Sequence, residues 1–467
     1  MKKGIKKFKD FPPPISLLKL MGPSFVLLAL GLGSGELILW PYLVANFGLG
    51  IVWGAALGIT FQYFLNMEIE RYALVKGESV FVGFAKIFKW APAWFILSTF
   101  VGFGLPGIIA SSAQILAYFF GLNNFKWLAI GLLLLVGFIL SVGKTVYGMM
   151  EKTTKTIVFI GVPILFILTL YLVKGIDVFN LFKGLVGQGD GYNWFPSGIS
   201  FATFLAAFAY AGAGGNLNLS QSIYVKEKGY GMGKYSHKIA GLFDRVSGEQ
   251  EIKLTGEEFA LNKKNISNFH KWWRLINLEH LLVFWLIGLT AICLLMLLSH
   301  ATVYEQADNT QGINFIINEG VHIGRQLTPA IGSIFLLVVG VMLFQTQLGV
   351  MDSTSRIMAE NFAIKQMERR RTKKVKLSKI YYAFVWSQIS FGIILFLFNV
   401  YEPKTLLVAG AVVNAVAMFV HVGMTILLNR RALNAPFKAR LWRELVMLII
   451  FVFFGVFGTV TLWSQFF

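Results

Sequence analysis

The chain has 467 residues, of which 56% are hydrophobic and only 14% are charged, and its formal net charge is +19. A soluble protein of this length carries roughly a quarter charged residues, so the composition excludes the soluble globular class and indicates a polytopic membrane protein. The single cysteine, Cys293, excludes a disulfide framework and a thiolate metal cluster.

Residues 1–21 are expected to form a basic cytoplasmic tail, because "MKKGIKKFKDFPPP" lacks the cleavage site of a signal peptide. Residues 22–465 are expected to form one all-α membrane domain, since no segment shows the alternating pattern of a barrel strand. Eleven apolar segments are long enough to span a bilayer. They are 22–44, 48–67, 93–120, 127–143, 156–173, 198–222, 279–299, 327–349, 380–399, 405–428 and 443–465.

The distribution of basic residues supports this number of spans. When the segments between spans are assigned alternately to two sides, 37 of the 42 Lys and Arg residues fall on one side. Basic residues concentrate on the cytoplasmic side of membrane proteins. We therefore predict a multi-pass protein of the plasma membrane, with a cytoplasmic N-terminus and an external C-terminus.

The basic loops are expected to contact anionic lipid headgroups on the cytoplasmic side. We favour this interpretation over nucleic-acid binding for runs such as "KQMERRRTKKVKLSK". The segment "HKWWRLINLEH" is expected to be interfacial, with Trp272 and Trp273 at headgroup depth.

The first span contains a run that is unsuited to a continuous helix. "ALGLGSGELILWP" places Gly31, Gly33 and Gly35 within five residues and adds Glu36. An ionisable side chain within a span is costly, and it usually faces a cavity or a partner. A protonated Glu36 bonded to a neighbouring helix is the alternative.

The sixth span contains a second run of this kind, "AGAGGNLNLSQS". The second run lies five spans after the first, and this odd offset predicts two inverted repeats, 22–173 and 198–428, followed by an extra helix, 443–465. Paired interruptions at matching places in two halves indicate a transporter whose freed backbone groups meet a solute near the bilayer midplane. Close packing of small residues is the alternative explanation.

Several other polar residues within or beside the spans have two interpretations each. His421 is expected to form a hydrogen bond between helices rather than to bind a ligand. Asp352 and Glu360 are expected to be solvated or paired with arginine at the cytoplasmic end of the eighth span. A polar path and interhelical bonding explain the remaining side chains equally well; these are Gln62, Gln345, Gln347 and Asn414.

Four stretches together carry a resemblance to a known family. They are "GPSFVLLALGLGSGE", "RYALVKGESV", "AGAGGNLNLSQS" and "FQTQLGVMDSTSRIMAENF", which includes Gln345. They resemble the corresponding segments of the Nramp family of divalent metal transporters, and the similarity covers nearly the whole chain. The resemblance implies a LeuT-type fold, in which helices 1, 2, 6 and 7 rock against helices 3, 4, 8 and 9.

The chain departs from the family at the residues that the resemblance makes metal ligands. In the first span the family's ligand Asp falls on Gly33, its Pro on Ser34 and its ligand Asn on Glu36, while Gly35 is retained. In the sixth span the ligand Met falls on Ala213, with Pro and His on Gly214 and Gly215, while Asn216 is retained. Span 93–120 also lacks the acidic residues that the family associates with proton movement.

The oxygen ligands left by these changes are Glu36, Asn216, Asn218 and freed carbonyls, of which Glu36 and Asn216 are the expected metal ligands. Such a set suits a hard cation of the Mg²⁺ or Mn²⁺ class. The resemblance therefore implies a secondary transporter of a divalent cation that works by alternating access, and we expect the protein to be monomeric. A transporter of a small organic solute, such as an amino acid or amine, is the alternative, and a sensor that uses the fold without transport is a third. We expect no enzymatic activity and no cofactor, because the sequence shows no nucleophile–base pair and no phosphate-binding loop.

Overall fold

The computed structural model describes residues 8–20, 22–142, 146–189, 191–236, 253–306, 309–370 and 375–466. The first seven residues of the expected tail lie outside the described residues. So do Lys144, residues 237–252 of the basic loop after the sixth span, and part of the "KQMERRRTKKVKLSK" run.

The first half of the chain is mainly helical in its described part. After the short helix α1 (Leu17–Leu20), its elements are α2 (Pro23–Gly31), η1 (Ser34–Leu39), α3 (Trp40–Phe47), η2 (Leu49–Ile51), α4 (Val52–Lys76), α5 (Val80–Ile87), α6 (Ala91–Gly104), α7 (Gly107–Phe119), α8 (Lys126–Ser141) and α9 (Val146–Leu172). Helix α10 (Gly175–Leu185) follows and leads to the second half.

The second half repeats this arrangement. Its elements are α11 (Phe201–Ala209), α12 (Leu217–Lys228), η3 (Gly231–Tyr235), α13 (Lys263–His280), η4 (Leu281–Leu286), α14 (Ile287–Val303), α15 (Asn314–Gln326), α16 (Pro329–Arg370), α17 (Leu377–Leu397) and α18 (Pro403–Ala432). The chain ends with η5 (Ala435–Phe437) and α19 (Leu441–Phe466).

The predicted spans correspond to these helices. Among the described residues, nine helices are long and apolar enough to cross a membrane, and α8 is a shorter apolar helix in the place of the fourth predicted span. The sixth predicted span is divided into two short helices, α11 and α12, as its glycines predict. The all-α fold and the interruptions of the first and sixth helices are thus confirmed.

Two helices extend well beyond the spans predicted for them. Helices α13 and α14 form one continuous segment, Lys263–Val303, through the π-helical turn η4, whereas the sequence predicts a span only from residue 279. Helix α16 continues to Arg370, although the apolar run ends near residue 349. Hydropathy misses these extensions because they are polar in sequence, yet many of their side chains are buried.

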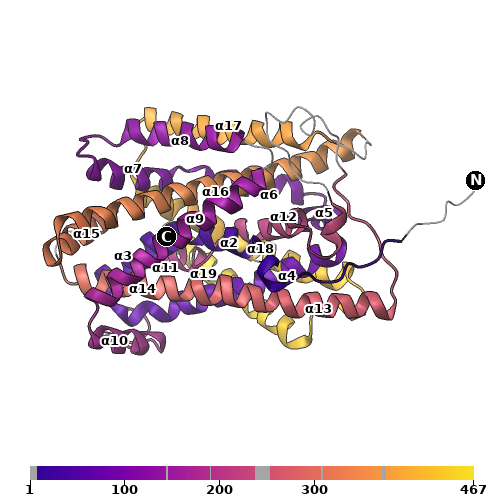
Figure 1. The fold of residues 1–467 in the computed structure, drawn as a ribbon, viewed down its shortest axis with the longest axis horizontal. Coiled ribbons are helices and arrows are strands. Elements are labelled where there is room, and N and C mark those ends of the chain that lie inside the picture. The colour runs from indigo at the N-terminus through magenta and orange to yellow at the C-terminus, as the bar shows by residue number, and fades with distance from the viewer. Residues whose placement is uncertain are drawn as a thin grey trace, which may run out of the picture.

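The long helices run roughly along the longest axis of the molecule (Figure 1). Helices α10 and α15 lie at one end, and the N-terminal segment with the start of α13 lies at the other. Contacts fix this second end: the Phe11 backbone N–H donates to Asn265 Oδ1 (3.1 Å), and the Phe259 ring packs edge-on against Phe437. The N-terminal segment, the start of α13 and the loop before α19 therefore share one end of the molecule.

Burial separates central helices from peripheral ones. The most apolar stretch of the first helix, Pro23–Phe47, is 100% buried, whereas those of α9 and α19 are only 28% buried. A helix that is apolar all round is buried within the protein or faces lipid. The first helix is therefore central, and α9 and α19 present apolar side chains outward.

The orientation predicted from the basic residues has a direct test at the start of α13, where Lys263 is exposed. With Cys293 replaced by serine, a Lys263→Cys variant in intact cells should react with a membrane-impermeant maleimide only after the membrane is permeabilised. Labelling from outside would reverse the assignment of both termini.

Candidate functional site at the two helix breaks

The first helix is interrupted where its glycines occur. Helix α2 ends at Gly31, and the chain resumes at Ser34 as the π-helical turn η1, which leads into α3. A Cβ atom on Gly33 would overlap the side chain of Thr346 on α16. Thr346 in turn donates its hydroxyl to the carbonyl oxygens of Leu32 (3.0 Å) and Ala29 (3.2 Å), so it occupies carbonyl groups that the interruption leaves free.

The sixth helix is interrupted for a conformational reason. Between α11 and α12, Gly212, Gly214 and Gly215 have φ values of 116°, 71° and 52°. Glycine adopts this left-handed region without the steric cost that a Cβ atom imposes. The sequence therefore permits a backbone path here that other residues would resist.

The two interrupted helices meet through their backbones. A Cβ atom on Gly35 would overlap the carbonyl oxygen of Tyr210, and one on Gly31 would lie 2.9 Å from Gly212 Cα. We call residues 32–36 and 210–216 the break site. The glycines of the break site therefore have two roles. They interrupt the two helices, and they allow the two backbones to pack closely; from the sequence alone these roles are alternatives.

Glu36 lies in η1 and is completely buried. Its Oε1 accepts a hydrogen bond from the Gly212 backbone N–H (2.9 Å), so the carboxyl group bridges both interruptions. Its Oε2 is buried and has no hydrogen-bond partner among the described residues. A buried polar atom without a partner is costly, and a ligand would provide the missing partner.

Gln62 of α4 holds both ends of the second interruption. Its Nε2 donates to the carbonyl oxygen of Ala209 (3.0 Å), where α11 ends. Its Oε1 accepts from the Gly214 backbone N–H (2.9 Å) and from Asn218 Nδ2 (3.3 Å). Gln62 is thus part of the break site's framework, and the Asn218 Oδ1 atom is left buried without a partner among the described residues.

The Asn216 amide forms its hydrogen bonds with α6 and α18 and not with Glu36. Its Nδ2 donates to Ser98 Oγ (2.8 Å) and Thr99 Oγ1 (3.0 Å) on α6, and its Oδ1 lies 3.3 Å from His421 Nδ1 on α18. All polar atoms of the Asn216 amide therefore have partners. His421 has the helix-bridging role expected from the sequence.

A second amide, Asn414 of α18, lies beside the same interruption. Its Nδ2 donates to the Gly102 carbonyl oxygen and to the Tyr210 hydroxyl, both at 2.9 Å. A Cβ atom on Gly215 would overlap the Asn414 amide. The Asn414 Oδ1 atom is buried and has no partner among the described residues, so it is a further oxygen available near the break site.

The remaining predicted site residues divide into two groups. Ser34, Ala213 and the glycines lie within the break site and are buried. Gln345 of α16 donates instead to Thr154 Oγ1 on α9 (2.6 Å), and no described hydrogen bond joins it to either interruption. The structure thus brings Glu36, Gly33, Ser34 and Gly35 together with residues 213–216 and 218, and it places the Gln345 amide group against α9.

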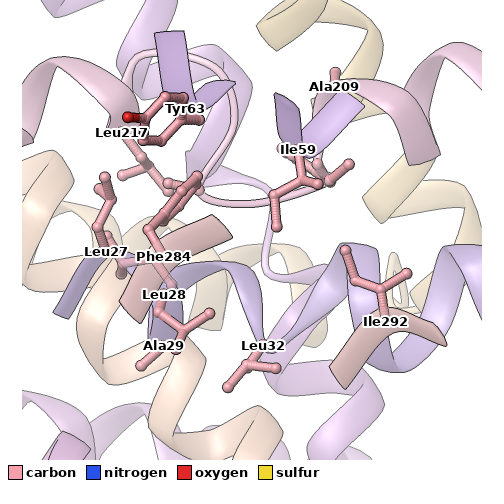
Figure 2. Packing of buried hydrophobic residues seen from close by; sticks show 14 of the residues in the cluster. Leu27, Leu28, Ala29, Leu32, Ile59, Tyr63, Ala209, Leu217, Phe284 and Ile292 are labelled. Carbon is pink, nitrogen blue, oxygen red and sulfur yellow. The ribbon is translucent and has the colours of Figure 1, made fainter. Parts of the chain in front are cut away.

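Buried apolar side chains from several helices pack together next to the two interruptions (Figure 2). They include Leu28 and Leu32 of the first helix, Ile59 of α4 and Phe284 of η4. A Cβ atom on Gly212 would lie 2.8 Å from the Phe284 ring. Such apolar surroundings have a low dielectric constant, which strengthens the attraction between a buried carboxylate and a cation.

The polar atoms of the break site fit a cation that is bound by one charged ligand and several neutral ones. Within the described part of the chain, no group of three or more His, Cys, Asp or Glu residues gathers into a metal cage. A cation at the break site would therefore take Glu36 Oε2 together with neutral oxygens of amides and carbonyls. Hard cations that retain some of their water are bound in this way.

Two buried polar clusters lie outside the break site. The sequence does not predict the first, around Glu279, and it predicts the second, around Asp352, in part. Ser24 Oγ at the start of α2 donates to Glu279 Oε2 (2.5 Å) and lies 2.8 Å from His280 Nδ1 on α13. The only sequence signal for this cluster was the acidic and basic pair, Glu279 and His280, that precedes an apolar run.

The Arg-paired role expected for Asp352 is confirmed, since Arg356 Nε lies 2.8 Å from Asp352 Oδ1.

Replacement of Gly35 by alanine tests the close approach of the two backbones. The new Cβ atom would overlap the Tyr210 carbonyl oxygen, and overpacking of this kind costs about 1–3 kcal/mol of folding free energy. We expect a lower melting temperature for the purified Gly35→Ala protein than for the wild type. The control is Gly131→Ala on α8, where nothing lies within 4 Å of the added atom; an equal loss there would contradict the argument.

No family model and no curated protein matches the sequence. A mutant of the Eremococcus coleocola manganese transporter is similar in structure, with a TM-score of 0.70 and 11% identity over 99% of this chain and 91% of that chain. MhsT in complex with L-phenylalanine gives a TM-score of 0.54 and 14% identity, covering 95% of this chain and 98% of that chain.

A third similar structure is Mhp1, a nucleobase-cation-symport-1 family transporter with bromovinylhydantoin bound. Its TM-score is 0.56 at 12% identity, over 97% of this chain and 93% of that chain. The chain has the LeuT fold. At these identities the similarity shows the fold alone, which includes the inverted repeats and the interrupted first and sixth helices.

Proposed function

We propose that the protein is a secondary transporter that carries a divalent cation of the Mg²⁺ or Mn²⁺ class by alternating access. The observation that carries the proposal is Glu36, a buried carboxyl group at the junction of both interrupted helices, with Oε2 lacking a partner among the described residues. The similar transporter structures support the general class, and they do not support enzymatic activity.

The preference for a hard cation rests on the chemistry of the available atoms. Among the described residues, the partnerless buried atoms around the interruptions include three oxygens, Glu36 Oε2, Asn218 Oδ1 and Asn414 Oδ1, together with the ring nitrogen Nε2 of His421 beside Asn216. Ala213 supplies no sulfur, and sulfur ligands favour softer transition metals. Oxygen donors without sulfur favour Mg²⁺ or Mn²⁺ over Cd²⁺.

A small organic cation, such as an amine, is the second candidate. It is favoured by the single carboxyl group at the break site and by the aromatic rings of Phe284 and Tyr210 that lie beside it. An ammonium group pairs with one carboxylate and is attracted to the faces of aromatic rings. An amine transporter therefore needs no further acidic ligand.

Uptake into proteoliposomes distinguishes the two candidates. The purified protein should take up Mn²⁺ saturably, excess Mg²⁺ should inhibit this uptake, and a mixture of amino acids and amines should leave it unchanged. Uptake of a radiolabelled amine or amino acid that Mg²⁺ does not inhibit would overturn the cation proposal in favour of the second candidate. We also propose that the protein works as a monomer in the plasma membrane, with its N-terminus in the cytoplasm.

The variant Ala213→Met tests whether residue 213 contacts the transported ion. Ala213 lies between two break-site glycines and is 2% exposed. A methionine sulfur at this position should raise the ratio of Cd²⁺ uptake to Mg²⁺ uptake by about tenfold, because soft ligands favour soft metals. Ala213→Leu is the control of similar size without sulfur, and an equal ratio in the two variants would place residue 213 outside the ion's coordination.

A further inference from the structure

A surface pocket of about 610 Å³ lies where α4, α13 and the start of α19 meet, away from the break site. Basic and aromatic side chains line most of it, including Arg71, Trp273, Arg274, Lys438, Arg440 and Arg443. It lies at the end of the molecule that holds the N-terminal segment, because Phe437 in the loop before α19 packs against Phe259 and Phe269.

The pocket has more positive charge than its carboxylate neutralises. Arg71 Nε and Arg443 Nε each lie 2.7 Å from the buried Glu68, so two guanidinium groups share one carboxylate. Arg443 is 6% exposed, and its Nη2 has no hydrogen-bond partner among the described residues. The next carboxylate along α19, Glu444, is already paired with Arg430 (2.7 Å).

Three further cations at the pocket are exposed. Arg274, Lys438 and Arg440 form no ion pair with any residue that the structure describes. An excess of cations around a concave site attracts anions and raises their local concentration. Guanidinium groups in particular match the geometry of phosphate oxygens.

Tryptophan rings next to the arginines show that the pocket lies where the polar surface of the protein meets its apolar surface. The Arg71 guanidinium lies 3.8 Å from the centre of the Trp273 ring, and that of Arg443 lies 5.3 Å from the centre of the Trp442 ring. Trp442 is 49% exposed, and beyond it α19 exposes Leu445 and Leu448 at 51% and 50%. Tryptophan is enriched where a membrane protein passes from hydrocarbon to headgroups.

We propose that this pocket binds the phosphate group of an anionic phospholipid. The cations would hold the phosphate, and the acyl chains would lie along the outward-facing leucines of α19. This continuity with an apolar face favours a lipid over a soluble phosphate, which needs no such surface. The proposal is independent of the substrate carried at the break site.

Lipid binding to the full-length protein tests the proposal. The wild type, purified in neutral detergent, is titrated with phosphatidylglycerol and with phosphatidylcholine, and bound lipid is counted by native mass spectrometry. The pocket variant combines Arg274→Gln, Lys438→Gln and Arg440→Gln. The control variant combines Lys365→Gln, Arg369→Gln and Arg370→Gln, which removes three charges from exposed positions near the end of α16.

We expect the pocket variant to bind phosphatidylglycerol about a hundredfold more weakly, since each cation near an anionic headgroup contributes roughly fivefold to affinity. The control variant should change this affinity by less than about threefold. Phosphatidylcholine should bind weakly to all three proteins, and millimolar inorganic phosphate should not displace phosphatidylglycerol.

Three outcomes would overturn the proposal. Equal losses in the two variants would show a diffuse effect of surface charge. Unchanged binding in the pocket variant would show that the lipid binds elsewhere. Displacement of phosphatidylglycerol by inorganic phosphate would identify the pocket as a site for a soluble anion.

Discussion

Replacement of Glu36 by glutamine is expected to abolish saturable uptake of Mn²⁺ into proteoliposomes while leaving expression and folding close to those of the wild type. Glutamine keeps the size of the side chain, and its oxygen can still accept the hydrogen bond from the Gly212 backbone N–H (2.9 Å in the wild type). The variant loses the negative charge, and an NH₂ group takes the place of the Oε2 atom that would bind the cation. In apolar surroundings no neutral oxygen replaces the attraction of a carboxylate for a divalent cation.

The matched control is Glu319→Gln. Glu319 is also buried, at 3% exposure, but it lies on α15, outside both interrupted helices. We expect this variant to transport Mn²⁺ within about twofold of the wild type, as for a substitution away from the substrate. If Glu36→Gln takes up Mn²⁺ as the wild type does, Glu36 is not a cation ligand and has only a structural role. Equal losses in the two variants would show a general effect of removing a buried carboxyl group.

Removal of the Arg356 guanidinium is expected to cause the largest loss of stability. Arg356 is 1% exposed, and it lies 2.6 Å from Glu227 Oε1 on α12 and 2.8 Å from Asp352 Oδ1 on α16. Without it, two buried carboxylates lose a common partner, and breaking a buried ion pair in this way costs about 3–5 kcal/mol. Arg356→Met, which retains much of the apolar volume, should therefore melt well below the wild type.

The control for this prediction is Arg370→Met, at the exposed end of the same helix. Surface substitutions usually change the unfolding free energy by less than about 0.5 kcal/mol, so its melting temperature should match that of the wild type. The comparison is made by thermal unfolding of both proteins in the same detergent. Equal melting temperatures for the two variants would show that the buried network adds nothing to stability.

The sequence predicts the fold well because each feature has a local cause. Apolar length predicts the helices, and clustered glycines predict where the first and sixth are interrupted. In the sixth helix three of these glycines have positive φ values of 116°, 71° and 52°, which favour glycine. In the first helix, Gly33 and Gly35 lie where a Cβ atom would overlap Thr346 or Tyr210. The predicted extents fail only where polar residues continue a helix. The start of α13 and the end of α16 are examples, because burial against other helices, rather than hydropathy, stabilises these turns.

The candidate site could be predicted only in part. Glu36 was identifiable because a carboxyl group within an apolar span is exceptional. The partners of Asn216 were not, because its amide meets Ser98 and His421, which lie far away in the sequence. Gln62 is one of several glutamines in the spans, and only the tertiary structure shows that it joins Ala209 to Gly214.

The contact between the backbones at Gly35 and Tyr210 has a consequence for how the site can open. Side chains that block a passage can rotate aside in nanoseconds without disturbing their helices. A carbonyl group packed against a glycine has no such freedom, because its position is fixed by the path of the main chain. The two interrupted helices can therefore separate at this contact only if one helix segment tilts or slides as a rigid body, which is a motion on the microsecond-to-millisecond scale.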